Sequence, residues 1–101
     1  MDIETTGFSA KFCSIYLIGC AVRQDRQLLL TQFFAETPAQ EPAILAAFAD
    51  YLSDKNSIVT FNGQAFDLPF LESRARRSGV NLPLRQLISI DLYRTARKYR
   101  A

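Results

Sequence analysis

Two stretches rich in β-branched and aromatic residues occupy much of the first third of the chain. One runs from Phe12 to Val22, the other from Gln27 to Phe34, and the polar residues 23–26 separate them. Apolar stretches joined in this way predict a β-hairpin. Residues 1–5 resemble the end of an earlier strand, which Thr5-Thr6-Gly7 breaks into a turn.

After the hairpin, helical and β-type patterns alternate. Apolar residues at helical spacing predict a helix from about 41 to 54, and residues 66–78 predict a second helix that Gly79 ends. Ser57 to Phe61 and Leu87 to Ile90 are short and β-rich, and a basic helix is expected from about Asp91 onward. The chain is therefore expected to be a single α/β domain, residues 1–101, with the order βββαβαβα.

Composition excludes several classes of protein. The 101 residues, 49% of them hydrophobic, are enough for one globular domain, and no apolar run is long enough to cross a membrane. Cys13 and Cys20 are expected about 23 Å apart on one strand, so they cannot pair, and free thiols fit a reducing cytoplasm. The absence of His excludes a Cys/His zinc site and a His-based catalytic triad.

The small net charge of +2 hides a strong segregation. Residues 1–72 have a net charge of −5, and residues 73–101 have a net charge of +7. An acidic part can hold cations and a basic part can hold phosphates, which together suit a nuclease. Solvated helix faces are the alternative explanation of the same charges.

Three carboxylates are expected to meet at strand ends. Asp2 and Glu4 are two positions apart in a strand and therefore project from one face, whereas Ile3 points inward. Asp67 follows the strand that ends near Phe61, at the start of a helix. Two like charges 4 Å apart repel by about 4 kcal/mol at an effective dielectric of 20, so a cation is expected between them. Hard oxygen ligands select Mg²⁺ or Mn²⁺, and two such ions can support phosphodiester hydrolysis.

The segments Asp2-Ile3-Glu4-Thr5-Thr6-Gly7 and Phe61-Asn62-Gly63-Gln64-Ala65-Phe66-Asp67 resemble the first two exonuclease motifs of the DEDD superfamily, whose members have a ribonuclease-H-like fold. The likeness is strongest to YprB-type domains and to the proofreading exonucleases of family B polymerases. It implies metal-dependent 3′-to-5′ hydrolysis of single-stranded DNA or RNA. It also implies a mixed five-stranded sheet flanked by helices, in which a three-strand antiparallel meander is followed by two strands parallel to the first.

The resemblance also implies roles for individual residues. Asp2, Glu4 and Asp67 are expected to be catalytic metal ligands, Thr5 and Thr6 to line the pocket for the terminal nucleotide, and Asn62 and Phe66 to hold substrate. These families end with a third motif in which His or Tyr precedes an Asp. Here no acidic residue follows Asp91, which is expected to cap the last helix. The chain thus resembles a family member shortened at both ends, and weak or no turnover is expected.

Several alternatives apply to the same residues. Asp67 can be a helix N-cap, and Thr5, Thr6 and Gly7 can form only a turn. Phe61, Leu68 and Phe70 can belong to the core. For the whole chain, the alternatives are a non-catalytic nucleic-acid-binding domain that uses residues 74–100 and a structural fragment. In the second case, self-association or a partner chain is expected to complete the fold.

Overall fold

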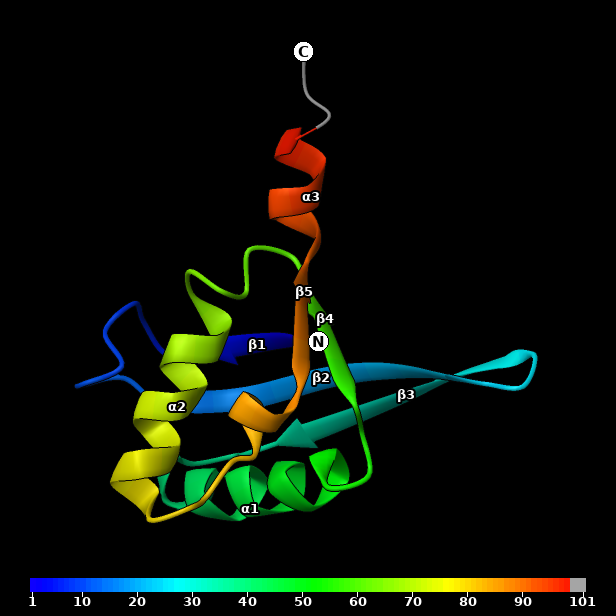
Figure 1. Ribbon diagram of the computed structural model, residues 1–101. Helices are drawn as coiled ribbons and strands as arrows, with labels where there is room; N and C mark the ends of the chain where they lie inside the picture. Colours follow the sequence, from blue (N-terminus) through cyan, green and yellow to red (C-terminus); the bar gives the residue numbers. More distant parts are fainter. Residues whose placement is uncertain (99–101) are drawn as a thin grey trace.

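The computed structural model describes residues 1–98 and has eight main helices and strands (Figure 1). Residues 99–101 lie outside this description, and they include Arg100 of the basic segment 74–100. The strands and helices are β1 (Asp2–Thr5), β2 (Ile15–Gln24), β3 (Gln27–Phe34), α1 (Glu41–Leu52), β4 (Ser57–Thr60), α2 (Asp67–Ser78), β5 (Ile88–Asp91) and α3 (Leu92–Lys98). Two short 3₁₀ helices, Pro38–Gln40 and Leu84–Gln86, precede α1 and β5. The predicted α/β class and the order βββαβαβα are confirmed.

The strands form two ladders with the predicted directions. β1, β2 and β3 are an antiparallel meander in that spatial order, and β4 and β5 pair in parallel. Within residues 1–98 the expected five strands pair as a three-stranded and a two-stranded group. The Met1 amino group donates across to the carbonyl oxygen of Val59 on β4 at 3.0 Å. β1 pairs with β2 from Asp2 opposite Gly19 to Thr5 opposite Ile15, and in residues 1–98 it does not pair with β4.

The core lies between the inner face of the meander and the two helices α1 and α2. Figure 1 shows α1 running beneath the hairpin of β2 and β3, with α2 across one end of the sheet. Residues of α1 at helical spacing, Ile44, Leu45, Phe48 and Leu52, are all buried, as the pattern predicted. The ring of Phe33 on β3 contacts that of Phe48, with centroids 5.8 Å apart, which fixes the hairpin on α1.

The start of β2 differs from the prediction, whereas the end of α2 agrees with it. β2 begins at Ile15 and not at Phe12, because the N–H groups of Phe12 and Cys13 both donate to the carbonyl oxygen of Ser9 and form a turn. Cys13 therefore lies outside the strand, although both cysteines are free as expected. The second helix ends as predicted at Gly79, whose φ of 70° is left-handed and whose N–H caps the helix by donating to carbonyls of its last turn.

A buried ion pair joins the elements around the β1–β2 loop. Nη2 of Arg74, on α2, lies 2.6 Å from Oε1 of Glu41, at the start of α1, and the Glu41 residue is 2% exposed. The second Glu41 oxygen accepts the N–H of Ile15 at 2.6 Å, and Arg74 also donates to the carbonyl oxygen of Ala10 at 3.0 Å. The hydrogen bond to Glu41 raises the pKa of Arg74. These contacts fix both helices against the loop that follows β1.

None of the helices in residues 1–98 combines the length and the apolar character that crossing a bilayer requires.

Candidate functional site

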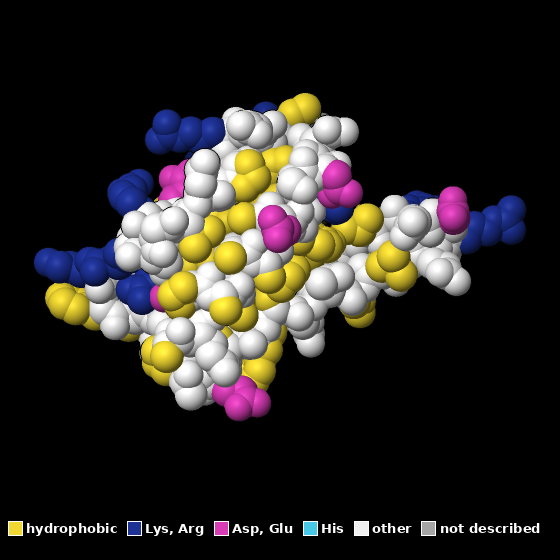
Figure 2. All heavy atoms as spheres, turned by 90° about the horizontal axis from the view of Figure 1, so that it is seen from below, with side chains coloured by type: hydrophobic (Ala, Val, Ile, Leu, Met, Phe, Trp, Pro, Cys, Tyr) yellow, Lys and Arg dark blue, Asp and Glu magenta, His cyan; other side chains and the backbone are white. Residues whose placement is uncertain are grey.

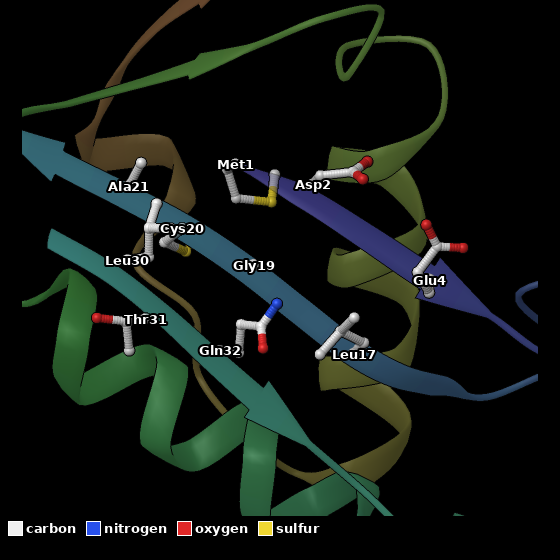
Figure 3. A pocket seen from close by; sticks show the side chains of 10 residues that line it. All are labelled: Met1, Asp2, Glu4, Leu17, Gly19, Cys20, Ala21, Leu30, Thr31 and Gln32. Carbon is white, nitrogen blue, oxygen red and sulfur yellow. The ribbon is translucent and has the colours of Figure 1, made fainter. Parts of the chain in front are cut away.

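The two carboxylates of β1 project from the outer face of the meander. Ile3 is 6% exposed and packs in the core, whereas Asp2 and Glu4 on either side of it are exposed, as the strand alternation predicted. They line an outer-face pocket of about 350 Å³. Figure 3 shows both side chains at the edge of this pocket, beside β2. Gly19, which pairs with Asp2, has no side chain to fill the space between Asp2 and Gln32 of β3.

Asp67 approaches the same strand from α2. It is the first residue of α2 and is 8% exposed, and the N-cap position belongs to Phe66, which makes no side-chain capping bond. Burial raises the pKa of Asp67, and the negative charge of Asp2 raises that pKa further. The nearby N–H of Ile3 acts in the opposite direction. The Asp67 carboxyl therefore lies next to β1, within the electrostatic reach of Asp2 and Glu4, and the simple N-cap alternative does not describe it.

The loop between β4 and α2 is tightly built. Asn62 has a left-handed φ of 59° and an exposed side chain, and the carbonyl oxygen of the buried Gly63 accepts the N–H of Leu68 at 2.8 Å. A Cβ added to Gly63 would lie 2.4 Å from the Cβ of Thr60, so only glycine fits at this position. The chain can turn sharply from β4 into α2 because of this close approach, which brings Asp67 toward β1.

Asp91 supports this loop from the end of β5. Its carboxylate accepts the N–H groups of Asn62 at 2.7 Å and Gln64 at 3.3 Å, and it also accepts the N–H of Tyr93 at 3.0 Å in the first turn of α3. The residue is 5% exposed, and burial by itself raises the pKa of Asp91. The three N–H donors, together with Arg94, outweigh burial, so the net pKa is lowered. Asp91 therefore caps α3, as predicted. It also stabilises the loop between β4 and α2, which was not predicted.

The two threonines after Glu4 already have hydrogen-bond partners. The Thr5 hydroxyl donates to the carbonyl oxygen of Gly7 at 2.7 Å, and the Thr6 hydroxyl accepts the N–H of Ser14 at 3.0 Å. Both hydroxyls therefore stabilise the turn that ends β1. That role does not test their expected contact with a nucleotide, which stays a prediction.

Aromatic rings gather beside Asp67. The half-buried ring of Phe66 lies 5.5 Å from that of Phe70, which is 3% exposed and belongs to the core as the alternative expected. Phe61 is 66% exposed, so the core alternative is wrong for this residue. Phe8, which follows Gly7, is 93% exposed, and its ring lies 6.5 Å from that of Phe66. The motifs did not identify Phe8 as a candidate site residue. The feature of the sequence that could have identified Phe8 is its position directly after the first motif.

The three carboxylates are neighbours without forming a compact cage. Within residues 1–98, no group of three or more His, Cys, Asp or Glu side chains is arranged to hold a metal ion. The donor chemistry nevertheless fits a hard cation, because Asp2, Glu4 and Asp67 offer only carboxylate oxygens. Asp2 and Glu4 are exposed, whereas Asp67 is buried.

Basic residues lie on α2 and α3, and they differ in whether their side chains are exposed or already paired. Arg76 and Arg77 are exposed in the last turn of α2, and Arg97 and Lys98 are exposed in the last turn of α3. Figure 2 shows Lys and Arg side chains gathered at the α2 end of the molecule, with others at the tip of the β2–β3 hairpin. Arg74 is bound to Glu41, so this residue does not belong to the exposed basic surface.

Comparison with known proteins agrees with the fold. A family model described as the RNase_H superfamily matches residues 1–101. The protein YprB of Bacillus subtilis (strain 168) is 32% identical over 99 residues, which cover 96% of this chain and 24% of YprB. A DNA polymerase of Pyrococcus glycovorans is 36% identical over 53 residues, or 50% of this chain and 7% of the polymerase. The chain thus spans about a quarter or less of the length of these relatives. The α/β fold and the match over the whole sequence lead to one conclusion: the chain belongs to the RNase_H superfamily.

Proposed function

We propose that this domain acts in the metal-dependent hydrolysis of nucleic-acid phosphodiesters, in the manner of a 3′-to-5′ exonuclease. The observation that carries the proposal is the position of Asp67, buried at the start of α2 beside the strand that presents Asp2 and Glu4. Membership of the RNase_H superfamily and the similarity to a DNA polymerase support a nuclease-type function at the level of the family.

In this proposal Asp2, Glu4 and Asp67 are the catalytic residues and hold Mg²⁺ or Mn²⁺. Bound metal supplies an activated water and neutralises the charge that develops on the leaving oxygen. The contribution of the chain is to keep three carboxylates on neighbouring rigid elements. In β1, Asp2 and Glu4 point outward from the same face. Asp91 binds the backbone of the loop that leads from β4 to Asp67.

Single-stranded DNA or RNA is the proposed substrate. Thr5 ends β1 and Thr6 follows it, and Asn62 and Phe66 lie between β4 and α2. Their closeness in sequence to the carboxylates supports a role in holding the terminal nucleotide. Exposed arginines of α2 and α3 give the domain a positive surface for phosphates. The ring of Phe66 is half-buried and therefore has some surface left for contact with a nucleotide.

We further propose that the isolated chain turns over weakly or not at all. Asp2, Glu4 and Asp67 provide three negative charges against the four positive charges of two divalent ions, so a second ion is expected to bind poorly. Asp91 is committed to three backbone N–H groups, which leaves it poorly placed to act as another ligand. The second candidate function, nucleic-acid binding without catalysis, is favoured by the same exposed arginines.

A cleavage assay on end-labelled single-stranded DNA and RNA distinguishes these functions. We expect slow cleavage or none with Mg²⁺ or Mn²⁺, and any cleavage is expected to disappear in Asp2→Asn and Asp67→Asn. Asp50→Asn is the matched control, because Asp50 is exposed on α1. Cleavage that persists in both site variants would contradict the assignment. Metal-independent binding that weakens with salt and survives Asp67→Asn supports the second candidate.

A further inference from the structure

The outermost strand of the meander, β3, has an unpaired edge. β3 pairs with β2 from Gln27 to Phe34, and within residues 1–98 no strand pairs with its other edge. The strand lies between β2 and α1 in the chain, far from both ends of the sequence. Figure 1 shows the β2–β3 hairpin extending beyond the rest of the molecule. An unpaired edge of this kind presents a row of backbone N–H and C=O groups to another strand.

The hydrogen bonds to β2 identify the backbone groups at this edge. Just after β3, the N–H of Ala35 donates to the carbonyl oxygen of Tyr16 on β2 at 2.9 Å. Successive residues of an antiparallel strand direct their backbone groups to opposite edges, so the odd-numbered residues of β3 face β2. The even-numbered residues therefore direct their N–H and C=O groups to the unpaired edge, and they are Leu28, Leu30, Gln32 and Phe34.

The composition of β3 favours pairing at this edge. Edge strands usually carry charged residues or Pro that prevent pairing with other chains, but β3 has neither from Gln27 to Phe34. Its outer face is apolar and open, since Leu28 is 64% exposed, Leu30 is 74% exposed and Phe34 is 60% exposed. Charges of opposite sign lie just beyond the two ends of the strand, on the exposed residues Arg26 and Glu36.

We propose that β3 pairs antiparallel with β3 of a second copy of this chain. The two copies are related by a two-fold axis that passes beside Thr31, so that Thr31 lies opposite its own counterpart. Two-fold symmetry reverses the direction of the second strand, which makes the same surface pair with itself. The two meanders then form one continuous sheet.

This register is the one in which the edge groups, the apolar side chains and the charges all match. Every edge-facing residue has a partner, which gives about eight backbone hydrogen bonds, two for each opposed pair. Leu28 lies opposite Phe34 of the second copy, and Arg26 lies opposite Glu36. A shift of the register by two residues in either direction loses one opposed pair. It also places Arg26 opposite Phe34, or Glu36 opposite Leu28.

Sedimentation equilibrium of the intact chain tests the proposal. From about 5 to 500 µM we expect a monomer–dimer equilibrium with a Kd below about 100 µM. Gln32→Pro removes an N–H donor at the unpaired edge and leaves the β2–β3 hydrogen bonds intact, so it should weaken the dimer by at least about tenfold. A chain that stays monomeric over this range, or a dimer that Gln32→Pro leaves unchanged, would overturn the proposal.

An exchange of charges tests the register. Arg26→Glu and Glu36→Arg should each weaken the dimer by about fivefold, and the double variant should return the Kd to within about twofold of the wild type. Arg23→Glu is the matched control, because Arg23 is exposed on β2 of the same hairpin and the net charge changes equally. A double variant as weak as the single variants, or a control as weak as Arg26→Glu, would contradict this pairing.

Amide hydrogen exchange tests the same edge without any substitution. The amides of Leu29, Thr31 and Phe33 face β2 and should be protected in the monomer. Raising the concentration of the wild-type chain from about 5 to 500 µM should slow exchange by at least about threefold at the four edge-facing amides, those of Leu28, Leu30, Gln32 and Phe34. Concentration-dependent slowing confined to other elements would place the contact between copies elsewhere and overturn the proposal.

Discussion

The carboxylate of Asp91 accepts the backbone N–H of Asn62 at 2.7 Å, across 29 positions of sequence. This contact connects the end of β5 to the loop that leads into Asp67. It makes one side chain responsible both for the start of α3 and for the shape of the loop beside the candidate site.

Asp91 should make stability fall in acid. Its pKa is lowered in the folded chain, so the folded state binds fewer protons than the unfolded state near pH 4. Its contribution is complete above the ordinary pKa of 3.8 and is lost as the pH falls through the lower folded pKa. Asp91→Asn should therefore lower the Tm at neutral pH, and its Tm should converge on that of the wild type in acid. Thermal unfolding from about pH 2.5 to 7 checks this, and a Tm difference independent of pH would contradict it.

Breaking the buried ion pair should be costly. Arg74→Met leaves the Glu41 carboxylate buried at 2% exposure without its guanidinium, which should destabilise the chain by about 3–5 kcal/mol. Adding Glu41→Gln should recover part of this loss, because a glutamine there can still accept the N–H of Ile15. Urea unfolding of the two variants measures both effects. A double variant no more stable than Arg74→Met would show that the uncompensated charge is not the cause.

Gly63 should tolerate no side chain. A Cβ at this position falls 2.4–2.6 Å from the three side-chain atoms of Thr60, so Gly63→Ala should cost about 1–3 kcal/mol by overpacking. Gly19→Ala is the matched control, since the nearest atom to its added Cβ is 3.9 Å away. Chemical denaturation measures the free energy of unfolding of both variants. Equal stability of the two variants would mean that the loop moves freely and does not fix the position of Asp67.

Local patterns predicted most of the fold. Helical spacing in α1 and the glycine stop at Gly79 depend on neighbouring residues, and both predictions are confirmed. The start of β2 was misplaced because a turn held by the Ser9 carbonyl oxygen competes with strand formation at Phe12 and Cys13. The pairing of β1 with β4 in the expected five-stranded sheet joins segments far apart in the sequence, and the alternation of residues does not encode such pairing.

The candidate site was predicted in part. Alternation along β1 correctly placed Asp2 and Glu4 outside and Ile3 inside. The loop-bracing role of Asp91 was missed because hydrogen bonds to residues 62 and 64 join segments far apart in the sequence. Arg74 was counted among the basic residues available to phosphate, because its partner Glu41 lies 33 positions away. Contacts of this kind depend on tertiary packing and have no local signal.

The proposed function requires that Asp2, Glu4 and Asp67 bind a divalent cation together. The most direct measurement is a Mn²⁺ titration followed by electron paramagnetic resonance of the free ion, on the wild type, Asp2→Asn, Asp67→Asn and the control Asp50→Asn. We expect one saturable Mn²⁺ site in the wild type and the control, and at least about tenfold weaker binding in each site variant. Mn²⁺ binding that is equal in all four proteins, or that is absent from the wild type, would show that these three carboxylates do not form a cation site.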